Sequence, residues 1–208
     1  MKDNFSTEQE KFWAGTFGNE YTERNSGNEL IARNLGLFAP ILSKTAGIQS
    51  ILEIGANRGL NLIALKSLLP KAICSAIEIN VQAAEVLSSL GFVEVYNQSI
   101  FNFEPDYKRD FVLSKGVLIH IAPEMLSKVY DLLYKSSQRY ICLAEYYNPT
   151  PVEVVYRGHE NKLFKRDFAG EMLDKYSDLQ LLNYGFAYHR DQNFTQDDFT
   201  WFLLEKKQ

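Results

Sequence analysis

The chain has 208 residues, of which 46% are hydrophobic and 23% are charged, and its formal net charge is −4. This composition is typical of one globular domain with a full core. Lys and Arg form no cluster, so we expect no nucleic-acid partner. The absence of a long apolar run and the polar N-terminus lead us to expect neither a membrane partner nor a signal peptide. Cys74 and Cys142 lie in apolar runs, which indicates reduced core residues of a cytoplasmic protein.

The first 45 residues are predicted to form a helical lid. Thr7 and Glu10 have the spacing of a capping box, which predicts a helix that Gly15 and Gly18 end. A second helix is predicted over residues 28–43 from the spacing of its apolar residues. Four aromatic side chains precede it and are predicted to cluster, either on the edge of the core or over a cofactor: Phe12, Trp13, Phe17 and Tyr21.

Strands and helices alternate between residues 51 and 144. Strands are predicted at 51–54, 71–79, 93–96, 110–114 and 139–144, and helices at 60–69, 81–90 and 124–136. Two later strands, 179–188 and 199–205, cannot continue the right-handed crossovers and are predicted to form an antiparallel hairpin. We therefore expect a single α/β domain over residues 1–208. It has a Rossmann-like, seven-stranded, mostly parallel sheet with a C-terminal antiparallel hairpin and helices on both faces.

Residues 145–171 interrupt this alternation. They lack clear periodicity, and Pro and Gly recur along them. A long irregular connection inside a compact domain is usually functional or disordered, and the aromatic and charged content here favours a function. We expect this insertion to face the substrate and to lead into a helix at 168–176.

The first strand runs into a turn that is rich in Gly and Asn and carries an acid at the strand end. Glu53, Gly55, Asn57 and Gly59 follow one another at intervals of two residues, and a helix starts directly after them. Such a turn directs free backbone N–H groups and the positive end of a helix at one place. A dinucleotide site would require G-x-G-x-x-G, which is not present. Glu78, at the end of the second strand, can accept hydrogen bonds from both hydroxyls of a ribose.

This pattern resembles motif I of the class I S-adenosylmethionine-dependent methyltransferases, acid-x-Gly-x-Gly-x-Gly, with Asn57 at the middle glycine. The terminal hairpin is also a trait of that family, and Glu53 suits the methionine ammonium group better than a pyrophosphate. The resemblance implies S-adenosyl-L-methionine as the cofactor, and we expect no metal. The expected cofactor contacts are Glu53, Gly55, Asn57, Gly59, Glu78, Ser99, Ile100 and Ser114. Trp13 and Tyr21 are added to them because aromatic faces can hold the sulfonium cation and exclude water. Lys115 and Gly116 are expected near the methionine end.

Four segments are similar, more narrowly, to the methylases associated with pseudaminic acid biosynthesis. They are residues 12–25, 114–126, 145–171 and 200–207. This resemblance implies transfer of a methyl group to a small sugar-type metabolite, such as a nonulosonic acid or a nucleotide-sugar. The acceptor atom and the oligomeric state do not follow from the sequence.

Candidate catalytic residues are few. Transfer of a methyl group from a sulfonium depends mainly on positioning, but a hydroxyl acceptor benefits from a general base. The candidate bases are His120 after the fourth strand, His159 in the insertion and Glu145 at the end of the fifth strand. The predicted substrate contacts are Tyr146, Arg157, Lys165 and Arg166, because cationic side chains suit a carboxylate or a phosphate. Surface ion pairs are the alternative for these cations.

Two other hypotheses stay open. A nucleotide-dependent oxidoreductase is disfavoured by the glycine spacing and by the terminal hairpin. A non-catalytic subunit that binds the cofactor or a partner is left open by Asn57 and Ser99, which depart from the family pattern, although Glu53 and Glu78 argue against it.

Overall fold

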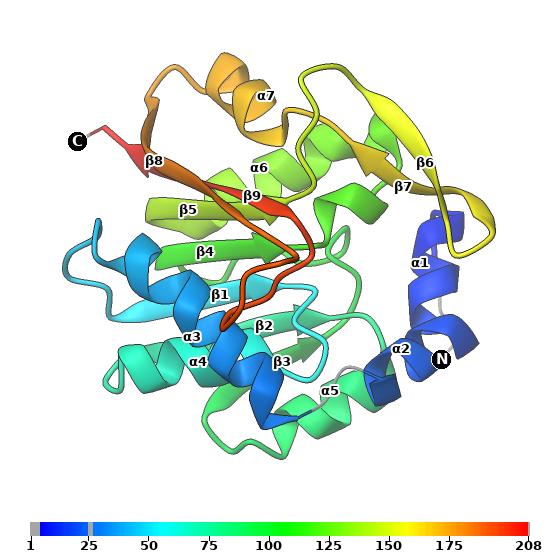
Figure 1. Cartoon of the computed structure of the whole chain (residues 1–208), viewed down its shortest axis with the longest axis horizontal. Helices are drawn as coiled ribbons and strands as arrows, with labels where there is room; N and C mark the ends of the chain where they lie inside the picture. Colours follow the sequence, from blue (N-terminus) through cyan, green and yellow to red (C-terminus); the bar gives the residue numbers. More distant parts are fainter. Residues whose placement is uncertain (1–4, 25–26, 208) are drawn as a thin grey trace.

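The central sheet of the computed structural model has the predicted architecture (Figure 1). The structure describes residues 5–24 and 27–207. Residues 1–4 and 25–26 of the predicted lid lie outside the described residues. The strands are β1 (Ser50–Ile54), β2 (Ile73–Glu78), β3 (Val93–Asn97), β4 (Arg109–Lys115), β5 (Ser137–Glu145), β8 (Leu179–Ala187) and β9 (Phe199–Lys206). Their order is β3-β2-β1-β4-β5-β9-β8. The first five are parallel and β9 is antiparallel to β5 and β8, so the predicted sheet is confirmed.

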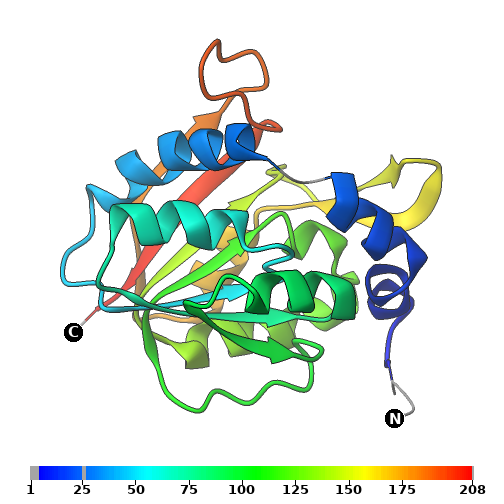
Figure 2. The same ribbon diagram turned by 90° about the horizontal axis from the view of Figure 1, so that it is seen from below.

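Helices cover both faces of this sheet (Figure 2), because its inner strands are apolar on both sides. One face carries α3 (Asn28–Leu42), α4 (Leu60–Leu68) and α5 (Val81–Ser88), and the other carries α6 (Leu126–Ser136) and α7 (Phe168–Lys175). Along β1, Ile51 and Leu52 point to opposite faces, as a strand requires. Cys74 and Cys142 are buried and free. Within the described ranges, no helix has the length and apolar character needed to cross a membrane.

Two short helices precede α3. They are α1 (Glu8–Ala14) and α2 (Thr16–Arg24). The predicted capping box is present: Thr7 Oγ1 accepts from the Glu10 N–H, and the Glu10 carboxylate accepts from the Thr7 N–H. Gly15 ends α1 as predicted, but the prediction that Gly18 also ends a helix is wrong, since Gly18 lies inside α2. A Cβ at Gly18 would lie 1.8 Å from the carbonyl oxygen of Trp13, so glycine is needed here for close packing.

The segment predicted to be irregular contains a second, two-stranded sheet. Its strands are β6 (Val152–Tyr156) and β7 (His159–Lys165), which are antiparallel and joined at Arg157 and Gly158. Both turn residues have positive φ, 50° and 85°, as a tight hairpin turn requires. Most of the hairpin is exposed and only Leu163 and Phe164 are buried, so its sequence lacks the regular apolar pattern of a core strand. The hairpin extends beside α1 in both ribbon views.

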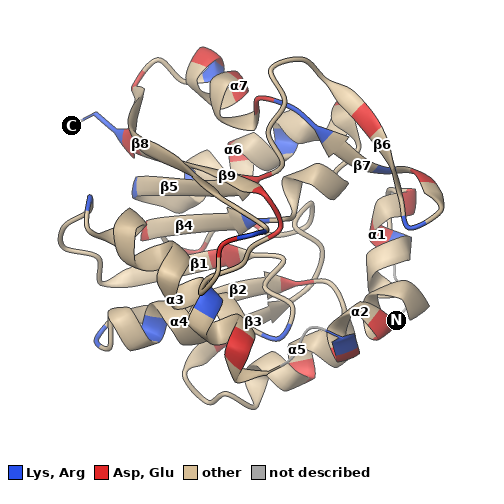
Figure 3. Ribbon diagram, in the orientation of Figure 1, with Lys and Arg blue, Asp and Glu red and all other residues tan. Residues whose placement is uncertain are grey.

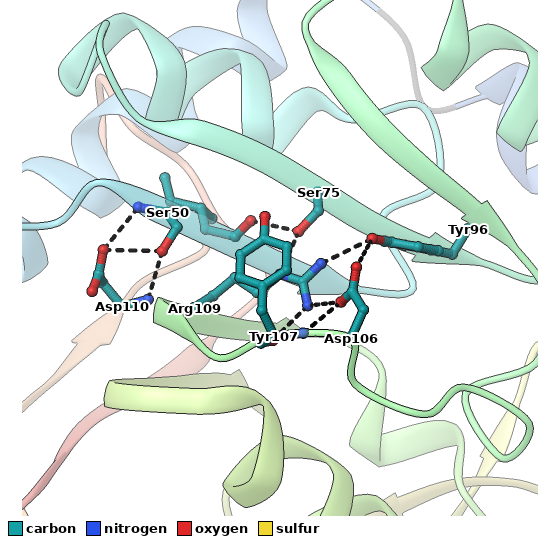
Figure 4. Close-up of polar contacts among 8 residues, drawn as sticks. Ser50, Ser75, Tyr96, Asp106, Tyr107, Arg109 and Asp110 are labelled. Atoms are coloured by element: carbon teal, nitrogen blue, oxygen red, sulfur yellow. Dashed lines mark hydrogen bonds and ion pairs between the residues drawn. The ribbon is translucent and has the colours of Figure 1, made fainter.

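A buried arginine joins the strands near the amino end of β4 (Figure 4). The side chain of Arg109 is fully buried, and its Nε donates to Ser75 Oγ of β2 at 3.2 Å. Its two terminal nitrogens donate to Tyr96 Oη at 3.0 Å, to the Tyr107 carbonyl at 2.7 Å and to the Asp106 carboxylate. Every nitrogen of this guanidinium therefore has an acceptor, and the cluster holds β2, β3 and β4 together.

Candidate functional site

The carboxyl ends of β1, β2 and β4 open into one cavity of about 390 Å³. Its walls come from α1, α2 and α3, the turn after β1 with the start of α4, the segments that follow β2, β3 and β4, and the loop between β8 and β9. Open α/β sheets bind ligands at this edge, and the volume is typical of a small-molecule site. Basic and acidic residues are interspersed over the surrounding helices (Figure 3). The kind of ligand that suits the cavity therefore depends on its individual side chains.

The turn after β1 has the conformation that its glycines predict. Gly55, Asn57 and Gly59 all have positive φ, at 62°, 48° and 79°. Asn is among the few residues other than Gly that adopt this left-handed conformation readily. Asn57 therefore adopts, without being a glycine, the left-handed conformation that a glycine would otherwise supply. Gly55 and Asn57 line the cavity, whereas Gly59 is buried against Leu87 of α5.

Glu78 is fixed at the end of β2 by two backbone N–H groups. Its Oε2 accepts from Asn57 at 2.7 Å and its Oε1 accepts from Asn80 at 2.8 Å. The residue is buried against the protein but lines the cavity, and burial raises the pKa of its carboxyl above the ordinary range. Each oxygen retains a lone pair, so the carboxylate can accept two hydroxyl hydrogen bonds from a ligand.

Three buried oxygens in and beside the same turn have no hydrogen-bond partner among the described residues. They are Glu53 Oε2, Asn57 Oδ1 and Asn61 Oδ1. Glu53 is fully buried at the end of β1, and its Oε1 accepts from Asn61 Nδ2 at 2.6 Å. Burial raises the pKa of its carboxyl to about 8. Buried acceptors are normally satisfied, so a ligand group with several N–H donors, such as an ammonium group, fits here.

Beyond β3, the cavity wall joins the sheet to α1. Ser99 is buried, its Oγ donates to the Glu10 carboxylate, and the same oxygen accepts from the Phe101 N–H at 3.1 Å. Ser99, Ile100 and Glu10 all line the cavity. The sequence marked Glu10 only as a helix cap, because its local spacing explains it fully and its contact with Ser99 spans 89 residues.

His120 lines the cavity on the side of β4, in the short turn η1 (Leu118–His120). Its Nδ1 lies 2.6 Å from the carbonyl oxygen of Lys162, so Nδ1 carries the proton and Nε2 has a free lone pair. The ring is packed between Trp13 and Tyr156, with centroids at 4.6 and 5.0 Å. Burial lowers the pKa of His120 to about 4, so the ring is neutral near pH 7.

Glu145 and Ser114 are buried behind the cavity wall and do not line it. Glu145 Oε1 accepts from Ser114 Oγ at 2.7 Å and from the N–H groups of Val117 and Leu118 at 3.1 and 3.2 Å. Its Oε2 accepts from the Ile119 N–H at 3.4 Å. Burial raises the pKa of this carboxyl to about 7. These contacts engage both oxygens of the carboxylate and fix the loop that carries His120.

The other predicted catalytic and substrate residues lie outside the cavity wall. His159 is exposed on β7, with its ring 5.0 Å from Phe12 and 5.8 Å from Phe17 between centroids. Arg166 pairs with Glu171 at 2.7 Å, which is the alternative expected from the sequence.

Aromatic rings accompany the remaining predicted substrate residues. Tyr146 stacks on Phe199 at 5.1 Å, and Lys165 lies over Tyr146 at 5.2 Å. Arg157 is exposed and lies over the ring of Tyr156.

The structure adds cavity residues that the sequence did not single out. Asn61 lies in the first turn of α4, two residues after Gly59, where its helical spacing gives no sign of its bond to Glu53. Gln196 and Asp197 come from the β8–β9 loop, which reads in sequence as a polar turn. Lys115, expected near the methionine end, lines the cavity, and burial lowers its pKa against the opposing charges of Glu53, Asp197 and Glu145.

No protein-family model matches the sequence, and no curated protein matches it. The structure is similar to the plantazolicin methyltransferase BpumL in complex with SAH, with a TM-score of 0.65, 14% identity, and coverage of 96% of this chain and 94% of that chain. Burkholderia thailandensis 1,6-didemethyltoxoflavin-N1-methyltransferase is similar with a TM-score of 0.68 and 10% identity, over 96% of this chain and 87% of that chain. Magnesium protoporphyrin IX methyltransferase from Synechocystis PCC 6803 with bound SAH is similar with a TM-score of 0.68 and 12% identity, over 95% of this chain and 98% of that chain.

Identities this low establish the fold and not the substrate. None of these similarities supports the narrower resemblance to pseudaminic acid methylases. The chain has the Rossmann-like fold of the S-adenosylmethionine-dependent methyltransferases.

Proposed function

We propose that this protein is an S-adenosylmethionine-dependent methyltransferase that acts on a small molecule. One observation carries the proposal: the fixed Glu78 carboxylate and the side chains of Asn57 and Asn61 line the same cavity. Among the described residues, the Oδ1 atoms of both Asn side chains have no donor, and neither has Oε2 of Glu53, which bonds to Asn61 and does not itself line the cavity. A ribose suits Glu78, and a primary ammonium group suits the oxygens that have no donor. S-Adenosylmethionine contains both groups, and Lys115 supplies a cation for its carboxylate. A dinucleotide would bring a pyrophosphate toward Glu53, which disfavours an oxidoreductase.

The similar structures support a small acceptor. Their names specify plantazolicin, 1,6-didemethyltoxoflavin and magnesium protoporphyrin IX, and all three structures contain bound S-adenosylhomocysteine (SAH). The narrower sequence resemblance adds a sugar-type acceptor of nonulosonic acid or polysaccharide biosynthesis to the proposal. Arg157 and Lys165 remain the proposed contacts for an acidic group on that acceptor, since neither has an ion-pair partner within the described ranges.

When bound, the cofactor supplies an electrophilic methyl group on a sulfonium. His120 Nε2 is the proposed acceptor for the proton that leaves an acceptor hydroxyl as the new bond forms to carbon. The bond from Nδ1 to the Lys162 carbonyl holds the ring in the required tautomer. Trp13 and Tyr21 cover this end of the cavity with aromatic surface, which excludes water and suits a cation. Glu145 positions the loop that carries His120.

Calorimetric titration tests the cofactor. We expect S-adenosylmethionine and S-adenosylhomocysteine to bind with dissociation constants in the micromolar range, and NADH not to bind. Glu78→Gln should weaken both adenosyl ligands at least about tenfold, because it removes the charge that accepts the ribose hydroxyls. Glu85→Gln, an exposed site on α5, is the matched control. Binding of NADH alone, or of none of these ligands, would overturn the proposal.

A further inference from the structure

The cavity wall beyond β3 contains a carboxylate that comes from the N-terminal helix and not from the sheet. Glu10 is only 6% exposed. Its Oε2 accepts from the N–H groups of Ser6 and Thr7, both at 2.8 Å, and from their hydroxyls at 2.8 and 3.1 Å. Burial opposes ionisation, but the hydrogen bonds from Ser99, Ser6 and Thr7 lower the pKa of this carboxyl below its ordinary value. Glu10 is therefore a fixed anion.

Glu10 lines the cavity, and its other carboxylate oxygen, Oε1, can accept a further hydrogen bond. Among the described residues, Oε1 accepts a hydrogen bond from Ser99 Oγ alone, and a carboxylate oxygen can accept two. Ser99 donates its single hydroxyl proton to Glu10, so this hydroxyl has no proton left for a ligand. The side chains at this place thus offer acceptors and a negative charge, which select a ligand edge that donates.

The strand order determines which part of the ligand reaches this edge. The three oxygens that suit an ammonium group lie at the turn after β1, and Glu78 ends the neighbouring strand β2. A ribose at Glu78 separates the amino-acid end of the cofactor from its base. The base then lies over the end of β3, where Ser99, Ile100 and Phe101 line the cavity.

We propose that Glu10 accepts a hydrogen bond from the exocyclic amino group of adenine, so that the N-terminal helix selects an adenosyl cofactor. The inference rests on the proposed function, because it takes the ligand to be a sulfur-linked nucleoside. Adenine presents an amino donor at this position, whereas a 6-oxo purine presents an acceptor that a carboxylate repels. A site built to bind a donor group strongly rejects an analogue that lacks it.

The proposal links cofactor binding to the position of α1. The same helix contacts the β6–β7 hairpin, where Gln9 Nε2 donates to the Asn161 carbonyl at 3.0 Å and the rings of Phe12 and His159 pack together. A base held by Glu10 adds a contact between α1 and the sheet. Bound cofactor should therefore hold α1, and the aromatic ring of Trp13 behind it, over the cavity.

The test compares S-adenosylhomocysteine with S-inosylhomocysteine, which has a carbonyl in place of the amino group and a proton on the neighbouring ring nitrogen. The wild-type protein should prefer the adenosyl ligand by at least about tenfold, as expected for a hydrogen bond to a charged group. Glu10→Gln should reduce this preference to less than about threefold, because an amide accepts and donates equally well. The double variant Glu10→Gln/Ser99→Asp, which returns a carboxylate to the same place, should restore the preference. Glu8→Gln, on the exposed side of the same helix, should retain it.

A second variant covers the case in which Glu10→Gln disturbs the helix cap. Ser99→Ala leaves the Glu10 carboxylate and its cap intact, and it should preserve the preference for adenine. A loss of preference in Ser99→Ala, or an unchanged preference in folded Glu10→Gln, would overturn the assignment while adenosyl binding continued. Failure of both ligands to bind the wild-type protein would instead contradict the proposed function.

Discussion

Two polar clusters occupy opposite ends of the central strands, and they differ in how completely they are satisfied. At the amino end, Arg109 is fully buried and each of its nitrogens has an acceptor. At the carboxyl end, Glu53 is as deeply buried, yet within the described part of the chain three oxygens of Glu53, Asn57 and Asn61 have no donor. A satisfied cluster stabilises the fold, whereas an unsatisfied one is where a ligand supplies the missing partners. Variants at the two ends should therefore have opposite effects on stability and binding.

The largest expected effect is on stability, at the satisfied end. Arg109→Ala removes the common partner of Ser75, Tyr96 and Asp106, and it should lower the free energy of unfolding by about 3 kcal/mol. Affinity for S-adenosylhomocysteine should be unchanged in the folded fraction, because the cluster does not line the cavity. Urea denaturation and calorimetry measure the two quantities. Arg139→Ala, which breaks a half-exposed pair with Glu205, is the control and should cause a much smaller loss. An equal loss in both variants would contradict the special role of Arg109.

At the carboxyl end, a substitution should have the opposite effects, so that stability rises and ligand affinity falls. Glu53→Gln keeps an oxygen that can accept from Asn61 and adds an N–H₂ group that can donate to the free oxygens of Asn57 or Asn61. It should therefore raise the free energy of unfolding by about 1 kcal/mol. The same change should weaken S-adenosylhomocysteine about tenfold to a hundredfold, because the ligand ammonium loses its anion. A variant that was destabilised but bound normally would show that Glu53 serves the fold alone.

The pH dependence of stability tests the state of Glu53 in the free protein. Burial raises its pKa from 4.5 to about 8, so between these values the folded chain holds a proton that the unfolded chain releases. The free energy of unfolding should therefore fall as the pH rises through this window, by up to about 1.4 kcal/mol per pH unit. Glu145, with a pKa of about 7, contributes in the same direction. Glu53→Gln should flatten the profile, and a profile that rises with pH in both proteins would contradict the assignment.

Ligand binding should reverse this protonation. An ammonium group beside Glu53 stabilises the carboxylate, so S-adenosylhomocysteine should release a proton when it binds near pH 7. The released proton makes the calorimetric enthalpy depend on the ionisation enthalpy of the buffer. Glu53→Gln should remove that dependence, whereas the exposed control Glu85→Gln should retain it.

The sequence predicted the parts of the molecule that follow local or periodic rules. The β1 turn was predictable because Gly55, Asn57 and Gly59 each meet a backbone requirement. The hydrogen bonds that Glu145 accepts from its own loop could not be predicted, because a carboxylate at a strand end has the same sequence pattern whether it faces a ligand or a loop. The sequence did not single out Glu10 as a cavity residue, because the capping box with Thr7 already explains a glutamate at this position. The β6–β7 hairpin was missed because an exposed hairpin needs no apolar alternation.

The smallest expected effect separates the two roles of Asn57. Its backbone adopts φ 48°, and its side-chain oxygen has no donor among the residues that the structure describes. Asn57→Gly relieves the left-handed conformation and removes the unpaired oxygen, but it also increases the entropy of the unfolded chain. These terms nearly cancel, so the free energy of unfolding should change by less than about 1 kcal/mol. The Asn57 N–H still donates to Glu78, so affinity for S-adenosylhomocysteine should fall only about threefold. Asn57→Ala keeps the unfavourable φ and should be less stable than the glycine variant by about 1 kcal/mol. If Asn57→Gly instead abolished binding, the side-chain oxygen would be a principal ligand contact, and Asn57 would do more than take the place of a glycine in the turn.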